Sequence, residues 1–195
     1  ETNSLAHRTT WLRSDFFCGL KENIYEGKTA IKAVKEKFPE GFHSDTYYRM
    51  FESIPQKSIL SQYEREIEQT RDIISYRKRL GISKYEAVEY AVKRTGAANC
   101  GEQAILISKA LNEKDIPNKV ISMNIYKKHT SFPTESHAFC VIGLDDNAEI
   151  KNPATWGKDA AIVDMWSNIV AGAQDALKAF QKIFKINKEK SDVIF

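Results

Sequence analysis

The chain has 195 residues, of which 42% are hydrophobic and 28% are charged, and its formal net charge is +3. This composition is typical of a globular domain, and the small charge excludes the strongly basic profile of a nucleic-acid-binding protein. No apolar run approaches the roughly 20 residues that span a membrane, so we expect neither nucleic acid nor a membrane as a partner.

Helical patterns fill the first 95 residues. Apolar residues recur at helical spacing within 27–38. A short amphipathic segment at 47–54 and a long helix at 56–80 are predicted next. Ser83, with a glutamate three residues later, has the spacing of a capping box and predicts a further helix that ends near Gly96.

The pattern changes from Asn99 onward. This residue is a favourable N-cap for a helix that is apolar on most faces and therefore buried. Three short strands and a final helix are predicted at 119–126, 138–144, 160–165 and 169–186. Consecutive short strands favour antiparallel pairing, so we expect an α+β fold.

In this fold, residues 1–95 form a helical extension or cap that packs on the core. Residues 96–195 form that core, with a cysteine-bearing helix packed on a small antiparallel sheet and a helix at the C-terminal end. Because the chain has the length of one ordinary domain, the two parts can also form one continuous domain.

Cys100 lies at the start of the buried helix, in the run Asn-Cys-Gly-Glu-Gln-Ala. The partial positive charge of a helix N-terminus favours the thiolate, which is the nucleophilic form of cysteine. Unpaired N–H groups of the first helical turn are natural donors to an oxyanion. Gly101 leaves room for a substrate carbonyl beside the sulfur.

Two later residues can act with this thiol. His137 opens the second predicted strand, and we expect its ring at a sheet edge that faces the cysteine helix. Asp164 ends the third strand, where its carboxylate can hold the imidazole tautomer and stabilise the imidazolium. We therefore predict Cys100, His137 and Asp164 as nucleophile, base and orienting residue. Further candidates for oxyanion binding or substrate positioning are Asn99, Gly101, Gln103 and Trp166, the last of which also shields the His–Asp pair from water.

The three cysteines cannot all pair with one another, and they show no Cys-x-x-Cys spacing. This pattern favours free thiols in a reducing compartment such as the cytosol. Cys18 and Cys140 are expected in the apolar core. No closed four-ligand zinc pattern is visible, so neither a metal nor another cofactor is predicted.

The three motifs, Asn-Cys-Gly-Glu-Gln-Ala, Ser-His-Ala-Phe and Val-Asp-Met-Trp, resemble the papain-like and transglutaminase-like thiol enzymes, especially the compact members among bacterial toxins and effectors. The similarity covers about residues 95–170. His137 lies 137 − 100 = 37 residues after Cys100, and Asp164 lies 164 − 137 = 27 residues after His137. Papain-type proteases place their histidine roughly 130–150 residues downstream, so the short spacing is closer to the transglutaminase core. The upstream glutamine of papain-type enzymes has no counterpart at 91–95.

This resemblance implies acyl transfer through a cysteine thioester, by a transglutaminase or glutamine deamidase. For a bacterial effector it implies a virulence role, secretion into a host cell and a host protein as substrate. A papain-like cysteine protease is an alternative within the same chemistry. A second alternative is a non-catalytic protein-binding module with a vestigial triad. The aromatic residues of the N-terminal half are compatible with such a docking surface: Tyr47, Tyr48, Phe51 and Tyr63.

Overall fold

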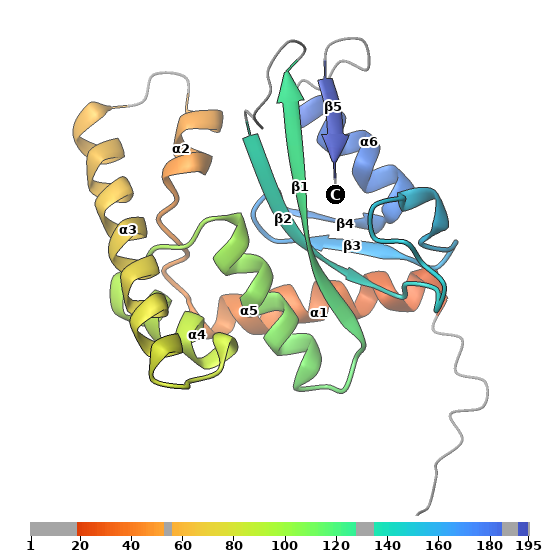
Figure 1. The fold of residues 1–195 in the computed structure, drawn as a ribbon, viewed down its shortest axis with the longest axis horizontal. Coiled ribbons are helices and arrows are strands. Elements are labelled where there is room, and N and C mark those ends of the chain that lie inside the picture. The colour runs from red at the N-terminus through yellow and green to blue at the C-terminus, as the bar shows by residue number, and fades with distance from the viewer. Residues whose placement is uncertain (1–18, 53–55, 128–134, 185–190, 195) are drawn as a thin grey trace, which may run out of the picture.

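The computed structural model of the protein describes residues 19–52, 56–127, 135–184 and 191–194. The helices are α1 (Leu20–Lys37), α2 (Asp45–Phe51), α3 (Lys57–Arg79), α4 (Lys84–Thr95), α5 (Cys100–Asn112), the short 3-10 helix η1 (Pro153–Thr155) and α6 (Ala173–Ile183). The strands are β1 (Asn118–Lys127), β2 (Glu135–Ile142), β3 (Ala161–Asp164), β4 (Ile169–Gly172) and β5 (Ser191–Ile194). In Figure 1, α5 stands between the sheet and the group formed by α2, α3 and α4.

Within the described residues, the strands form one antiparallel sheet in the order β4-β3-β2-β1-β5. This arrangement confirms the expected α+β class. The ladder between β2 and β3 is short, because it runs only from Ile142↔Ala161 to Cys140↔Val163. The first half of β2 pairs with β1 alone, and this unpaired side is where the candidate site lies.

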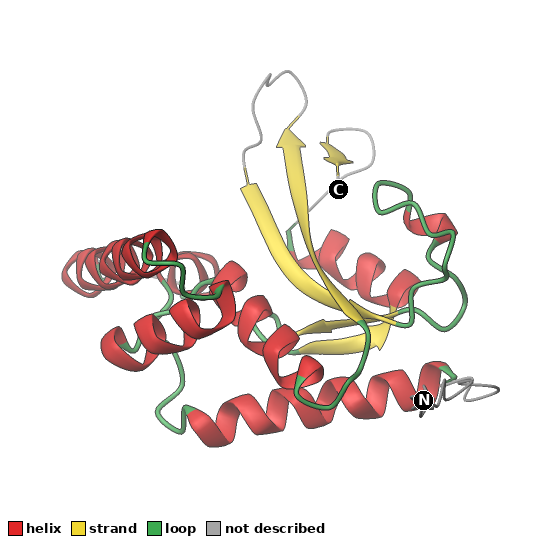
Figure 2. Cartoon of the chain, turned by 60° about the horizontal axis from the view of Figure 1, so that its bottom comes forward, coloured by secondary structure: helices red, strands yellow, loops and turns green. Residues whose placement is uncertain are grey.

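The two faces of the sheet pack against different helices, because successive side chains of a strand point to opposite sides. Cys140 and Val163 belong to a core cluster that they share with α1, α4 and α5. Phe139 and Ile162, on the other face, pack in a second cluster with Phe180 of α6. The sheet therefore lies between two layers of helix (Figure 2).

The first helix is part of the core around the sheet. Ile31 and Val34 of α1 are buried in the cluster that contains Leu106 of α5 and Val163 of β3. The side chain of Val163 packs so close to the backbone of α1 that a Cβ added at Gly27 would lie 2.5 Å from Val163 Cγ2. Glycine is the residue that permits this approach.

Local capping explains where α4 and α5 begin and end. Ser83 Oγ accepts a hydrogen bond from the Glu86 N–H and donates one to the Glu86 carboxylate, which confirms the predicted capping interaction. The helix ends at Gly96, whose φ of +72° is in the left-handed region that favours glycine. The next helix begins after Asn99, and the Asn99 N–H donates to Glu102 Oε2 at 3.0 Å.

One local expectation is wrong. Residues 169–172 form β4 rather than the first turn of a helix, because Asn168, with φ +58°, closes a turn that returns the chain along β3. The β-branched Ile169 and Val170 suit this extended conformation. His137 is the third residue of β2, on the stretch that pairs with β1 but not with β3, so the strand has an open edge there, as expected. Its side chain is on the same side of the strand as Phe139, because the two are two residues apart.

Two further expectations concern Cys18 and membrane-spanning helices. The expected core position of Cys18 lies outside the described residues. Among the described helices, none is both long enough and apolar enough to cross a bilayer.

The close contact between α1 and β3 makes Gly27→Ala a test of this packing. We expect the substitution to lower the free energy of unfolding by about 1–3 kcal/mol, because the added methyl group must displace Val163. Alanine otherwise stabilises a helix by about 1 kcal/mol relative to glycine. Gly101→Ala is the matched control, because its added Cβ would have no atom within 4 Å. Equal unfolding midpoints of the two variants in urea would contradict the contact.

Candidate active site

Cys100 is the first residue of α5 and is half-buried. The helix is fixed at this end by a reciprocal capping box, in which the side chains of Asn99 and Glu102 each accept a hydrogen bond from the backbone of the other residue. Beside the sulfur, Gly101 borders open space, since a Cβ built there would meet nothing within 4 Å. The thiol is therefore held at a rigid helix start, next to room for another molecule.

His137 and Asp164 meet where β2 and β3 diverge. His137 Nε2 lies 2.6 Å from Asp164 Oδ2, and the two side chains are 1% and 2% exposed. The last paired position of this ladder is Cys140↔Val163. The histidine lies three residues beyond it, on the stretch of β2 that β3 has left.

Asp164 is held in its orientation by the turn that follows β3. Its Oδ1 accepts hydrogen bonds from the backbone N–H groups of Trp166 at 3.0 Å and Ser167 at 3.4 Å. Its Oδ2 accepts from the Ser167 hydroxyl as well as from His137. With both oxygens satisfied, the carboxylate is fixed as a hydrogen-bond acceptor for the imidazole ring.

The histidine interacts with both predicted partners. Burial of the ring opposes its charged form, but the hydrogen bonds with Asp164 and Cys100, together with the charges of these groups, raise the pKa of His137 from 6.5 to about 9. Because Nε2 faces Asp164, Nδ1 is the nitrogen left for Cys100. The structure thus brings together the three residues that the sequence pointed to.

Aromatic rings enclose the imidazole. The centroid of the His137 ring lies 5.0 Å from Trp166, 5.1 Å from Phe184 and 5.2 Å from Phe180. Trp166 is only 5% exposed, so its indole covers the His–Asp pair as expected. Water is excluded from this side of the ring, which strengthens the electrostatic interaction between the pair.

The side chains of Asn99 and Gln103 are already engaged within the protein. Asn99 Oδ1 accepts from Ser44 Oγ, and Asn99 Nδ2 donates to Asp45 Oδ1. Gln103 Nε2 donates to the carbonyl of Ala98 at 2.9 Å. Both side chains are more than nine-tenths buried. They shape the start of α5, and the donors left for a bound substrate are backbone N–H groups of its first turn.

Sequence reasoning missed Ser44 and Ser167. Ser167 directly follows the Asp-Met-Trp segment, and a serine at this spacing can bond back to the aspartate. Ser44 is 5% exposed and contacts the site from the position just before α2, 55 residues before Asn99. Its place before Asp45 is a signal for an N-cap, but no local pattern predicts a contact over that distance.

The remaining candidates do not join the site. Cys140 is fully buried, its thiol donates to the carbonyl of Ala104, and burial raises its pKa to about 12. His43 bonds to Glu66 and stacks on Tyr63. Among the described residues, no group of three or more His, Cys, Asp or Glu is arranged to hold a metal ion.

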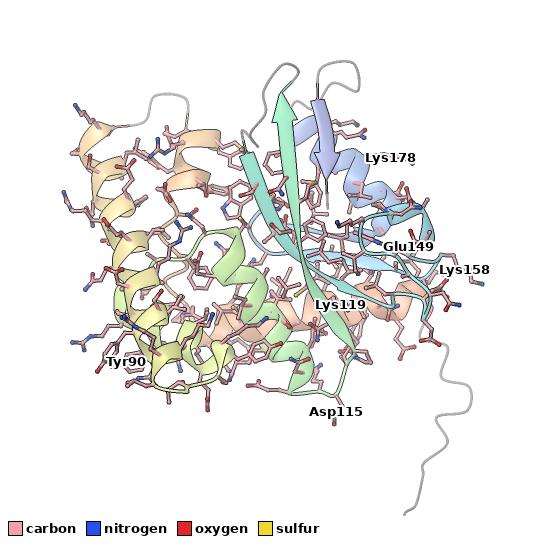
Figure 3. All side chains as sticks on the ribbon, in the orientation of Figure 1. Tyr90, Asp115, Lys119, Glu149, Lys158 and Lys178 are labelled. Atoms are coloured by element: carbon pink, nitrogen blue, oxygen red, sulfur yellow. The ribbon has the colours of Figure 1, made fainter. Side chains whose placement is uncertain are left out.

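A cavity of about 870 Å³ lies away from these residues. Its walls come from α1, the loop after α5, and the ends of β1 and β2. Asp115 and Lys119, which line it, lie where α5 ends and β1 begins (Figure 3). The 13 residues of α5 separate this end from Cys100 by about 20 Å at 1.5 Å per residue.

Comparison with protein-family models, curated proteins and solved structures gives no match to this chain. The resemblance of the three motifs to thiol enzymes therefore rests on the residues that carry it.

The raised pKa of His137 predicts a pH-dependent stability. The folded pKa lies above the unfolded value, so the contribution to stability is complete below about pH 6.5 and is lost as the pH rises through about 9. The slope between these limits is at most about 1.4 kcal/mol per pH unit. We expect the imidazole resonances of His137 to titrate near pH 9 in NMR spectra.

Asp164→Asn is the control for this titration. Its imidazole loses the carboxylate that favours the charged form, so we expect a midpoint nearer 6.5 and a weaker loss of stability between pH 7 and 9. A wild-type midpoint near 6.5 would contradict the assigned hydrogen bonds.

Proposed function

We propose that the protein is a cysteine-nucleophile acyl-transfer enzyme, in which Cys100 attacks, His137 transfers protons and Asp164 orients the imidazole. The observation that carries this proposal is the buried pair of His137 and Asp164, whose imidazole also interacts electrostatically with the half-buried thiol of Cys100. The base contacts the nucleophile and is itself oriented by a third group, which is the geometry that activates a nucleophile.

The charge of the imidazole matters for the chemistry. The raised pKa of His137 keeps the imidazole protonated at neutral pH, so it can donate a proton to a leaving group. Cys100 attacks in this mechanism as the thiolate, which is the nucleophilic form of cysteine. The thiolate adds to the substrate carbonyl, and the oxyanion that forms requires hydrogen-bond donors. We assign this role to backbone N–H groups of Cys100 and Gly101, because the nearby Asn99 and Gln103 side chains have protein partners.

Proton transfer completes the reaction. For a glutamine side chain, the tetrahedral intermediate collapses to a thioester, and His137 donates its proton to the departing ammonia. The neutral imidazole then takes a proton from water or from a primary amine as that nucleophile adds to the thioester. Expulsion of the thiolate gives glutamate or a crosslinked amide and restores the ion pair.

The proposed substrate is a glutamine of a protein. Two features support it: the order Cys, His, Asp and the short spacing, which resemble the transglutaminase-like core. The resemblance to compact bacterial members further supports an effector that is secreted by a bacterium and acts on a host protein in the cytosol. The same geometry serves a cysteine protease, so the product has to distinguish the two reactions. The assembled thiol–imidazole contact argues against a vestigial triad.

Selective labelling of Cys100 tests the nucleophile. We expect iodoacetamide at pH 7 to modify Cys100 before Cys140, whose thiol is fully buried with a raised pKa, and before Cys18. Peptide mass spectrometry measures the order of modification. His137→Gln is expected to slow the modification of Cys100, while Cys140→Ala leaves the rate at Cys100 unchanged. Modification of Cys100 at the same rate in folded and unfolded protein would contradict an activated thiol.

Product analysis tests the reaction on glutamine. We expect wild-type protein incubated with host-cell extract and a labelled primary amine to give deamidated or amine-modified glutamine residues, and Cys100→Ala to give none. New chain termini that depend on Cys100 would instead identify a protease. Modified glutamine formed equally by Cys100→Ala would rule out the proposal.

The open space beside Gly101 predicts that a substitution there affects acylation and alkylation of Cys100 differently. We expect Gly101→Ala to fold normally but to slow acylation of Cys100 by p-nitrophenyl acetate at least about tenfold, because its methyl group occupies the place of the substrate carbonyl and hinders the oxyanion donors. Alkylation by iodoacetamide forms no oxyanion and is expected to change by less than about twofold. Equal slowing of both reactions would contradict the assigned oxyanion site.

A further inference from the structure

The hydroxyl of Ser44 lies between two parts of the candidate site. Ser44 Oγ donates to Asn99 Oδ1 at 2.7 Å and accepts from the indole Nε1–H of Trp166 at 3.2 Å. These partners lie 55 and 122 residues further along the chain. The serine itself precedes α2, which the sequence assigns to the helical extension.

The hydrogen-bonding capacity of this hydroxyl is fully used. A serine hydroxyl has one donor and two acceptor lone pairs. The donor goes to Asn99, and the acceptors take the Trp166 Nε1–H and the backbone N–H of Tyr47 at 3.2 Å. Ser44 is 5% exposed and Trp166 also 5%, so water does not readily replace the lost partner when one group is removed.

Both partners are adjacent to triad residues. Asn99 is the N-cap of α5 and directly precedes Cys100. Trp166 donates its backbone N–H to Asp164 and packs its ring on His137. Ser44 thus closes a ring of contacts that passes through Asn99, Cys100, His137, Asp164 and Trp166.

The burial of Ser44 does not come from packing of its own helix. None of the seven residues of α2 is buried, and Tyr47 and Phe51 are each 46% exposed. At its other end, α2 is attached by the ion pair of Arg49 with Glu64 on α3. Several contacts link α2 to the site. Ser44, Asp45 and Thr46 form hydrogen bonds with Asn99. The half-exposed rings of Tyr47 and Phe51 lie 5.5 and 5.7 Å from the ring of Trp166.

We propose that Ser44 is a positioning residue, whose hydroxyl holds the N-terminus of α5 against Trp166 and so sets the distance between Cys100 and His137. This role rests on the proposed function, because it concerns the geometry of the same triad. The helical extension then has a defined part in the site: it supplies the group that joins the nucleophile helix to the turn carrying Asp164.

The test compares Ser44→Ala with Ser108→Ala. Ser108 is an equally buried serine on α5 whose hydroxyl donates to Asn118, remote from the triad. We expect Ser44→Ala to slow acylation of Cys100 by p-nitrophenyl acetate about tenfold to a hundredfold, the size of effect that a small misplacement of reacting groups produces. Ser108→Ala is expected to change the rate by less than about twofold, even where it lowers the unfolding midpoint.

Three further variants identify the contact involved. Trp166→Phe keeps a ring on His137 but removes the Nε1–H, so it is expected to slow acylation. In the double variant, the added Ser44→Ala substitution is expected to slow acylation less than it does in the wild-type protein, because the shared hydrogen bond is already lost. Ser44→Thr retains the hydroxyl and is expected to restore the rate. In the Ser44→Ala variant, the NMR titration of His137 is expected to move toward 6.5.

The outcomes separate this inference from the proposed function. Wild-type Cys100 that is neither labelled selectively nor acylated would refute the proposed function itself. Selective labelling of the wild type, with equal acylation rates and equal His137 titrations in Ser44→Ala and Ser108→Ala, would refute only the role of Ser44. Because Trp166→Phe tests the same hydrogen bond, unchanged kinetics in that variant would also overturn it.

Discussion

The buried pair of His137 and Asp164 is the interaction on which the rest of the site depends. Both side chains are almost completely inaccessible, and a buried charge is costly unless it is paired and its remaining hydrogen bonds are satisfied. The turn after β3 meets this requirement through Trp166 and Ser167, which satisfy the carboxylate. The rings of α6 and Trp166 exclude water from the imidazole. A pair enclosed in this way leaves only one ring nitrogen for another partner, and that partner is Cys100.

The same requirement explains why a helix from the first half of the chain takes part in the site. The N-terminus of α5 carries unpaired N–H groups that need caps, and Asn99 supplies one within the helix. The side chain of Asn99 is itself buried, and Ser44 and Asp45 satisfy its two polar atoms. Hydrogen bonds between buried polar groups thus connect the start of α5 with α2. In contrast, α1 is joined to the sheet by apolar packing around Val163.

Much of the fold was predictable because its signals are local. The capping serine at 83, the left-handed glycine at 96 and the N-cap at 99 act within one helical turn and were recognised without tertiary information. The segment 169–172 was assigned to a helix because its apolar residues continue into α6. It forms β4 because the turn at Asn168 brings it beside β3, and a pairing partner outweighs the weak propensity of four residues. The position of His137 at an open strand edge agrees with the expectation, but the early end of the β2–β3 ladder that opens this edge has no local signal.

The sequence by itself determined the identity of the candidate triad, the helix start at Cys100 and the α+β class, because residue chemistry, caps and periodicity are properties of neighbouring positions. The tertiary structure alone decided that the β2–β3 ladder stops at Cys140↔Val163, that Nε2 of His137 faces Asp164, and that Ser44 joins Asn99 to Trp166. These features depend on strand register and on contacts between residues 27 to 122 positions apart. Such contacts form only when the whole chain packs, so no local pattern encodes them.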